Sequence, residues 1–157
     1  YVTFVMGASG GGGGSGTVDV GPGPSIQVEQ MPGPRSSQLD YHGTINVTVA
    51  GERVDFSGQR YQLNDERFHF EGGNGRVWHG HAEDITLEFA MATVGIDVNE
   101  TAVTFRGTTY RESDPGTEVV VEVNGEPVDP ASYVLQGTRQ PANGDRIHVA
   151  VVTDGTG

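Results

Sequence analysis

The chain has 157 residues, enough for one domain, and its 21 acidic residues against 9 basic ones give a formal net charge of −12. This charge argues against nucleic acid and anionic membrane surfaces as partners, and the absence of cysteine excludes disulfides, thiolate-bound metals and cysteine nucleophiles. All 9 basic residues are arginine. An acidic chain without lysine is typical of extreme halophiles, in which high salt screens self-repulsion, so we expect a haloarchaeal protein.

The first 38 residues are expected to form an extended N-terminal arm. Residues 1–6 (YVTFVM) are β-branched and aromatic, which favours a strand, and residues 7–37 are rich in Gly, Pro and Ser. Such a composition buries too little apolar surface to fold alone and predicts a flexible tether. An apolar strand on a tether suits insertion at the sheet edge of another copy, through Tyr1, Val2, Phe4 and Met6.

Residues 39–157 are expected to form an α+β domain, a mixed or antiparallel sheet with one buried helix packed on it. Strict alternation predicts a strand over 44–49, and a second short strand carries Val54 and Phe56. The next elements are a hairpin over 68–81 and an apolar helix from Ile85 to Val94, with Asp84 as N-cap and Gly95 at its end. The closing strands, loosely β-grasp-like in their order, are 102–105, 118–123 before the turn Asn124-Gly125, and 146–152.

The hairpin FHFEGGNGRVWHGH, residues 68–81, carries three of the five histidines. His79 and His81 alternate on a strand, so their rings share a face. If the loop has four residues, His69 pairs opposite Trp78 and faces away from them. If it has five, His69 lies opposite His79 and three imidazoles share one face; His42 and Glu71 could complete a site.

Two interpretations of these imidazoles stay open. As ligands, imidazoles with a carboxylate and no thiolate favour a transition metal such as Cu or Zn. Alternatively, the rings pack beside the aromatic residues and hydrogen-bond the backbone. Catalysis has weak support, because a set such as Ser57, His69 and Asp84 has no diagnostic spacing, and we expect a protein that is not an enzyme.

The order of motifs over residues 40–152 resembles a family of uncharacterised secreted or extracytoplasmic His-rich α+β proteins. The matching segments are Tyr41-His42-Gly43-Thr44, Phe68-His69-Phe70-Glu71, Val77-Trp78-His79-Gly80-His81, Thr86-Leu87-Glu88-Phe89, Val94-Gly95-Ile96, Val123-Asn124-Gly125 and Gly144-Asp145-Arg146-Ile147. The chain departs from that pattern at Thr44, where the family has a second early histidine. The resemblance implies an extracytoplasmic location and a face that bears histidines.

Two sequons, at Asn46 and Asn99, are compatible with a secreted glycoprotein. Together with the arm, they predict a non-catalytic structural protein at the cell surface, a subunit of a filament joined to copies of itself through its N-terminal strand. The alternative is a surface-tethered His-rich module that binds a transition metal. Neither hypothesis requires a membrane span within this chain, which has no apolar stretch long enough.

Overall fold

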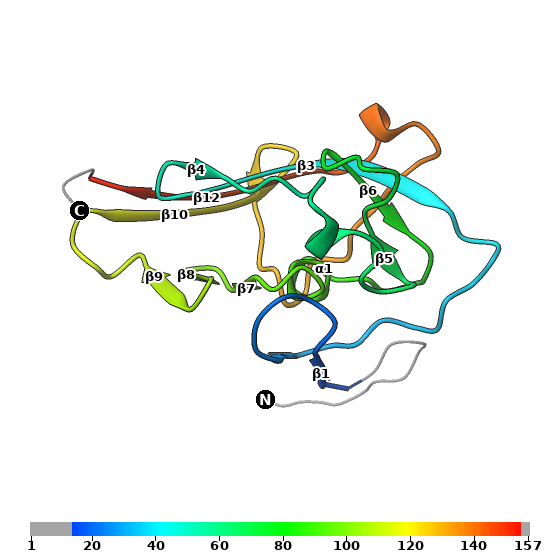
Figure 1. Cartoon of the computed structure of the whole chain (residues 1–157), viewed down its shortest axis with the longest axis horizontal. Coiled ribbons are helices and arrows are strands. Elements are labelled where there is room, and N and C mark those ends of the chain that lie inside the picture. The colour runs from blue at the N-terminus through cyan, green and yellow to red at the C-terminus, as the bar shows by residue number, and fades with distance from the viewer. Residues whose placement is uncertain (1–13, 155–157) are drawn as a thin grey trace.

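A mixed β-sheet organises the chain, and the computed structural model describes residues 14–154 of it (Figure 1). The sheet has seven strands in the order β11-β10-β12-β3-β6-β5, with β4 beside β3. Its members are β3 (Tyr41–Val49), β4 (Glu52–Arg53), β5 (Phe68–His69), β6 (Val77–Gly80), β10 (Thr117–Val123), β11 (Glu126–Pro127) and β12 (Arg146–Thr153).

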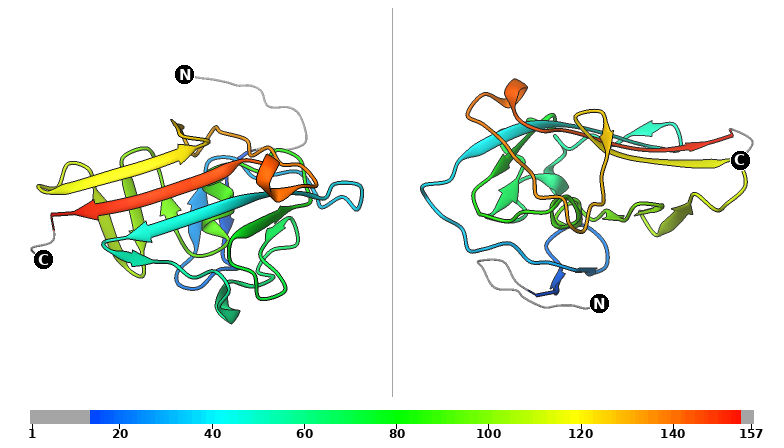
Figure 2. Two further views of the ribbon diagram at one scale, coloured as in Figure 1. Left: turned by 90° about the horizontal axis from the view of Figure 1, so that it is seen from above. Right: turned by 180° about the vertical axis from the view of Figure 1, so that it is seen from behind.

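The long strands β10, β12 and β3 lie side by side in the view from above (Figure 2). β12 runs parallel to β3, with Ile147 beside Ile45, whereas β10 is antiparallel to β12 and β6 is antiparallel to β3. The predicted mixed sheet is therefore confirmed. The parallel pair joins the strand near the start of the domain to the strand at its end, so the central part of the sheet closes only when most of the chain is present.

Smaller elements complete the fold. β1 (Gly16–Val18) pairs with β2 (Ile26–Val28), and β7 (Asp97–Val98), β8 (Ala102–Phe105) and β9 (Thr108–Arg111) form a second small sheet. Two 3-10 turns, η2 (Gln59–Tyr61) and η3 (Pro141–Asn143), lie in the connections. Among the described residues, no helix is long and apolar enough to cross a membrane.

The α-helix, α1 (Leu87–Ala92), is shorter than expected and begins two residues later. Thr86, not Asp84, is its N-cap: the Thr86 side chain accepts a hydrogen bond from the Phe89 N–H, whereas Asp84 has a left-handed φ of 62°. The predicted end is confirmed at Gly95, whose φ of 80° accompanies hydrogen bonds from Gly95 N–H to Ala92 and from Ile96 N–H to Met91. Every residue of the helix is buried, as predicted.

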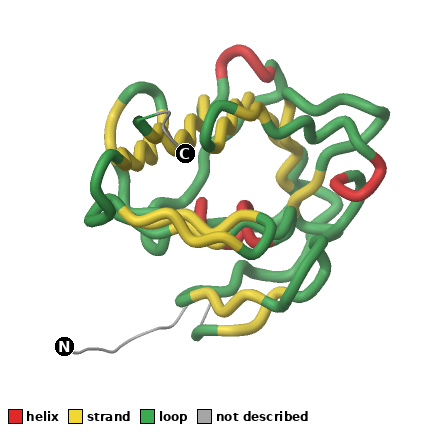
Figure 3. Tube along the Cα trace, turned by 60° about the vertical axis from the view of Figure 1, so that its left-hand side comes forward, coloured by secondary structure: helices red, strands yellow, loops and turns green. Residues whose placement is uncertain are grey.

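The core lies between the large sheet and a layer that contains α1 and β7 to β9 (Figures 1 and 3). Alternate residues of β3, namely Ile45, Val47 and Val49, are buried, whereas Asn46 between them is exposed. The same alternation holds in β10, whereas in β12 three consecutive residues, Val149 to Val151, are buried. The Asn124-Gly125 turn is also confirmed, with φ of 56° and 84°. The expected strand at Val54 and Phe56 is wrong: β4 ends at Arg53, and both residues instead enter the core.

The N-terminal segment departs from the expectation of an extended arm. Residues 16–28 form the β1–β2 hairpin, and Val18, Ile26 and Val28 are buried in the same core as α1. The Glu29 N–H also donates to the Glu88 carboxylate on the helix, at 2.9 Å. Residues 14–28 are thus packed on the domain, because the valine and isoleucine side chains between the glycines bury enough apolar surface to hold them. The predicted strand 1–6 lies outside the described residues.

Candidate metal centre

The register of three strands places three histidines in a row across the sheet. In the β5–β6 pair His69 lies opposite His79, and in the β3–β6 pair His42 lies opposite His79 from the other side. Of the two loop lengths that the sequence left open, the structure has the five-residue one, which places His69 opposite His79. Because side chains directly opposite one another stand on the same face of a sheet, the three imidazoles share one face.

The rings approach one another closely. The ring centroids of His42 and His79 are 4.6 Å apart, and those of His69 and His79 are 5.8 Å apart. His81 follows directly after β6, and its ring centroid is 5.0 Å from that of His69. Four of the five histidines of the chain therefore gather at the end of the sheet where β3, β6 and β5 meet.

Two carboxylates reach this histidine row. Glu71 Oε1 lies 2.9 Å from His69 Nε2 and 4.0 Å from His79 Nδ1. Asp40 Oδ1 lies 3.1 Å from His42 Nε2 and 3.9 Å from His81 Nδ1. Each carboxylate thus lies between two imidazoles, which is an arrangement that a metal ion or a proton can stabilise.

Main-chain carbonyl oxygens orient three of the four imidazoles through Nδ1. His69 Nδ1 is 2.9 Å from the Asp65 carbonyl oxygen, His81 Nδ1 is 2.9 Å from that of Leu39, and His42 Nδ1 is 3.3 Å from that of Thr138. A carbonyl can only accept, so in each case Nδ1 carries a hydrogen and Nε2 is the nitrogen left to face a ligand. In His69 and His42 that nitrogen faces a carboxylate oxygen, and such a contact needs a proton or a metal ion between the two atoms. Such contacts fix both the tautomer and the ring orientation.

Burial favours the neutral form of the central histidine. The pKa of His79 is lowered chiefly because desolvation by burial disfavours the charged ring, with smaller effects of His42, His69 and His81 in the same direction and of Glu71 against it. Metal ions bind the neutral imidazole and compete with protons for it. His79 is therefore in the form that a metal ion requires at neutral pH.

The six side chains fall into two groups that could each hold an ion. Asp40, His42 and His79 form one group and His69, Glu71 and His81 the other, and within each group the ligand atoms lie within 4.8 Å of one another. Imidazole and carboxylate without thiolate favour Zn²⁺, Cu²⁺ or Ni²⁺ over calcium or magnesium. All the predicted ligands, His42, His69, His79, His81 and Glu71, are brought together.

Sequence reasoning missed Asp40, although a signal was present. Asp40 and His42 are two residues apart where β3 begins, and residues at this spacing on a strand share a face. The other histidine, His148, lies on β12 and approaches Glu122 at 3.5 Å, apart from the row. The Ser57, His69 and Asp84 set is not assembled: the Ser57 hydroxyl donates to Asp55, and the His69 ring contacts Asp65 and Glu71.

The opposite face of the same strands is an aromatic layer. Trp78 is fully buried and lies 5.7 Å from Phe68 and 5.9 Å from Tyr41, measured between ring centroids. Gly43 is the cross-strand partner of Trp78, and a Cβ at Gly43 would lie 2.5 Å from the indole ring. The aromatic residues and the histidines are thus on opposite faces of the hairpin, and the aromatic side stabilises the strands that present the imidazoles.

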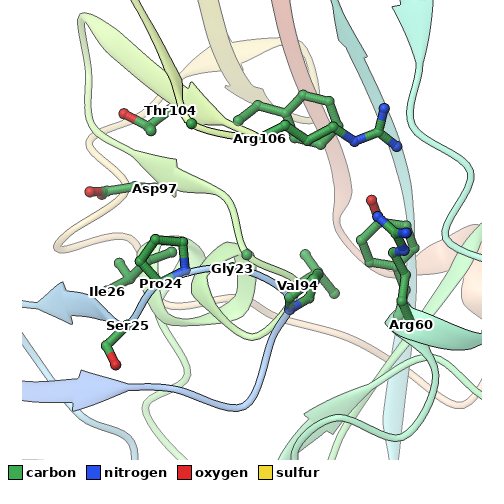
Figure 4. Close-up of a pocket in the computed structure, with 14 residues that line it drawn as sticks. Gly23, Pro24, Ser25, Ile26, Arg60, Val94, Asp97, Thr104 and Arg106 are labelled. Atoms are coloured by element: carbon green, nitrogen blue, oxygen red, sulfur yellow. The ribbon is translucent and has the colours of Figure 1, made fainter.

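A separate cavity of about 320 Å³ lies between the N-terminal hairpin and the second small sheet (Figure 4). Pro24, Ile26 and Val94 contribute apolar walls, and Figure 4 shows Arg60 and Arg106 on one side of the cavity and Asp97 on the other. None of its lining residues belongs to the histidine row. The cavity exists because residues 22–26 pack against the domain.

Both predicted glycosylation sites are exposed. Asn46 lies on the outer face of β3, and Asn99 lies in a turn in which its side chain accepts a hydrogen bond from the Thr101 N–H at 2.9 Å. Glycosylation itself stays a prediction. The predicted assembly residues Tyr1, Val2, Phe4 and Met6 lie outside the described residues.

Comparison with protein-family models, with curated proteins and with solved structures gives no match. The resemblance to the extracytoplasmic His-rich proteins therefore stays a prediction, as does the β-grasp-like order of the closing strands.

Proposed function

We propose that this protein binds transition-metal ions, Zn²⁺ or Cu²⁺, through the histidine row at the end of its main sheet. The observation that carries the proposal is the register that places His42, His79 and His69 opposite one another, with Asp40 and Glu71 between the rings. Three of the four rings are oriented by backbone carbonyls, and two carboxylates lie among the four rings. This is more than a core hairpin needs, since the buried aromatic face already stabilises these strands.

The surface charge supports a role in cation binding. A net charge of −12 raises the local concentration of cations around the protein, and it does so most strongly at low ionic strength. We propose a non-catalytic, extracytoplasmic module, consistent with the two exposed sequons.

The test is metal analysis of the protein produced without a histidine tag. We expect Zn²⁺ or Cu²⁺ to bind tightly to the wild-type chain and the His79→Ala/His81→Ala double variant to lose at least a hundredfold in affinity, by calorimetric titration. His148→Ala is the matched control and should bind as the wild type does. If the wild-type protein binds neither ion, or if the double variant binds equally well, the proposal fails.

A second proposal concerns self-association. The chain after the turn covers only the last three residues of β10: β11 pairs Pro127 with Glu122 and Glu126 with Val123, and the Val128 N–H donates to the Val121 carbonyl. The preceding part of β10 is consequently a sheet edge at which a strand from another copy could add, and the apolar segment 1–6 is a candidate for that strand. We propose a surface filament or assembly joined in this way.

Deletion of residues 1–6 tests this assembly. We expect the wild-type protein to form filaments or oligomers visible by electron microscopy and light scattering, and the truncated protein to remain monomeric. A variant with Tyr1, Val2, Phe4 and Met6 replaced by serine keeps the length of the segment and serves as the matched comparison. Assembly that persists in both variants would rule the proposal out.

A further inference from the structure

We propose that the histidine row is a two-ion centre, with one ion held by Asp40, His42 and His79 and a second held by His69, Glu71 and His81. This inference rests on the proposed metal-binding function and adds its stoichiometry and ligand assignment.

The two groups share no residue and have the same composition. Each contains two histidines and one carboxylate, with ligand atoms within 4.8 Å of one another. Sites of two histidines and one carboxylate are a common ligand set for Zn²⁺ and for other transition ions. The six side chains therefore divide into two complete three-ligand sites with none left over.

The two sites are also constructed alike. In one, His42 Nδ1 faces the Thr138 carbonyl and His42 Nε2 lies 3.1 Å from Asp40. In the other, His69 Nδ1 faces the Asp65 carbonyl and its Nε2 lies 2.9 Å from Glu71. Each site thus begins with an imidazole whose ligating nitrogen already faces a carboxylate.

These separations suit a shared ion. Ligand atoms bound at about 2.0–2.1 Å in a tetrahedron lie about 3.3 Å from one another. The nitrogen-to-oxygen distances of 3.1 Å and 2.9 Å need to open by only a few tenths of an ångström for an ion to enter between the atoms.

Two ions fit the row with less rearrangement than one. His42 and His69 stand on strands that are separated by β6, and each ring already faces its own carboxylate, at 3.1 Å for His42 and 2.9 Å for His69. The ligand atoms of one ion must lie within about 4 Å of one another. Binding both outer histidines to a single ion would require at least one of these rings to turn away from its carboxylate, whereas two ions keep both contacts.

The carboxylates connect the two sites. Glu71 Oε1 is 4.0 Å from His79 Nδ1, and Asp40 Oδ1 is 3.9 Å from His81 Nδ1, so each carboxylate also approaches a histidine of the other group. The ions are close enough to repel each other, and the second binds more weakly than the first. With three protein ligands each, both ions keep a coordination position for water or a small anion.

The experiment is equilibrium dialysis of the full, untagged chain against Zn²⁺, with the bound metal measured by mass spectrometry. We expect two ions per wild-type chain, one in Asp40→Asn/His42→Ala, one in His69→Ala/Glu71→Gln, and two in the control His148→Ala. Circular dichroism checks that each variant is folded. One ion per wild-type chain would overturn the two-ion inference and leave the proposed function intact, whereas no bound ion would overturn both.

A spectroscopic measurement on the wild-type chain avoids the variants. With Cu²⁺, the first equivalent should give an isolated signal by electron paramagnetic resonance, and the second should broaden it through dipolar coupling between neighbouring ions. A second equivalent that leaves the signal shape unchanged would contradict two adjacent sites.

Discussion

At the scale of single residues, Gly43 controls the spacing between the aromatic layer and the histidine row. A Cβ at this position would lie 2.5 Å from Trp78 Cζ2 and would also clash with the Asp145 carbonyl oxygen. We expect Gly43→Ala to lower the free energy of unfolding by about 1–3 kcal/mol, and to weaken metal binding because His42 is the neighbouring residue. Urea denaturation measures the first effect and calorimetry the second.

Gly58→Ala is the matched control for that substitution. Gly58 has an ordinary φ of −65°, and a Cβ there would meet its nearest neighbour at 3.6 Å. A loss of stability in Gly58→Ala as large as that in Gly43→Ala would show that the packing against Trp78 is not the cause.

Glu88 on α1 is expected to make the folding stability depend on pH. Burial raises its pKa above the ordinary value of 4.5, against the effect of the hydrogen bond from the Glu29 N–H, and Glu29, Asp97 and Asp129 raise it further. The folded state therefore binds this proton more tightly than the unfolded state, and the ionised side chain lowers stability as pH rises through the raised pKa.

The substitution Glu88→Gln removes this loss and keeps an oxygen that accepts the Glu29 N–H. We expect the variant to be more stable than the wild type at pH 7.5, by on the order of 0.5 kcal/mol, and the difference to shrink towards pH 4. Denaturation curves at both pH values measure it. A variant that is less stable at pH 7.5 would show that the charged form makes a favourable interaction in the folded protein.

At the scale of elements, the β1–β2 hairpin acts as part of the core. Val28 is buried on the side of β2 that packs with α1, whereas Val20 in the same segment is 41% exposed. We expect Val28→Ala to cost about 1–3 kcal/mol of folding free energy and Val20→Ala to cost less than about 0.5 kcal/mol. If Val28→Ala and Val20→Ala both change the thermal unfolding midpoint only slightly, residues 14–28 do not contribute to the core.

At the scale of the whole molecule, charge is the dominant property. With 21 acidic and 9 basic residues, self-repulsion opposes the compact state, and salt screens it within about 10 Å at 0.1 M and about 3 Å at 1 M. We expect the thermal unfolding midpoint to rise by several degrees between 0.1 M and 2 M KCl, as measured by scanning calorimetry. A midpoint that falls or stays constant over this range would contradict the halophilic interpretation of the composition.

Local patterns were sufficient for much of the fold. Alternation identified β3, β-branched runs predicted the strands observed as β10 and β12, Asn124-Gly125 identified a turn, and Gly95 identified the end of the helix. The start of that helix was misplaced because Asp84 and Thr86 are both good N-caps, and the choice between them depends on contacts outside the helix: the Leu87 and Glu88 N–H groups donate to the Tyr133 and Pro130 carbonyls.

The ligand chemistry of the candidate site was predictable from the amino-acid sequence: imidazoles and carboxylates, no thiols, and an alternating His79 and His81. The strand itself ends at Gly80, one residue before His81. Which residues come together at the site depends on how the strands pair. Strand pairing selected the register that places His69 opposite His79, and it brought His42 of β3 and the preceding Asp40 to the same row. Packing placed the valines of a glycine-rich segment in the core. The reason is physical: periodicity shows which face a side chain occupies, whereas strand pairing depends on the burial of both partners, which are far apart in the chain.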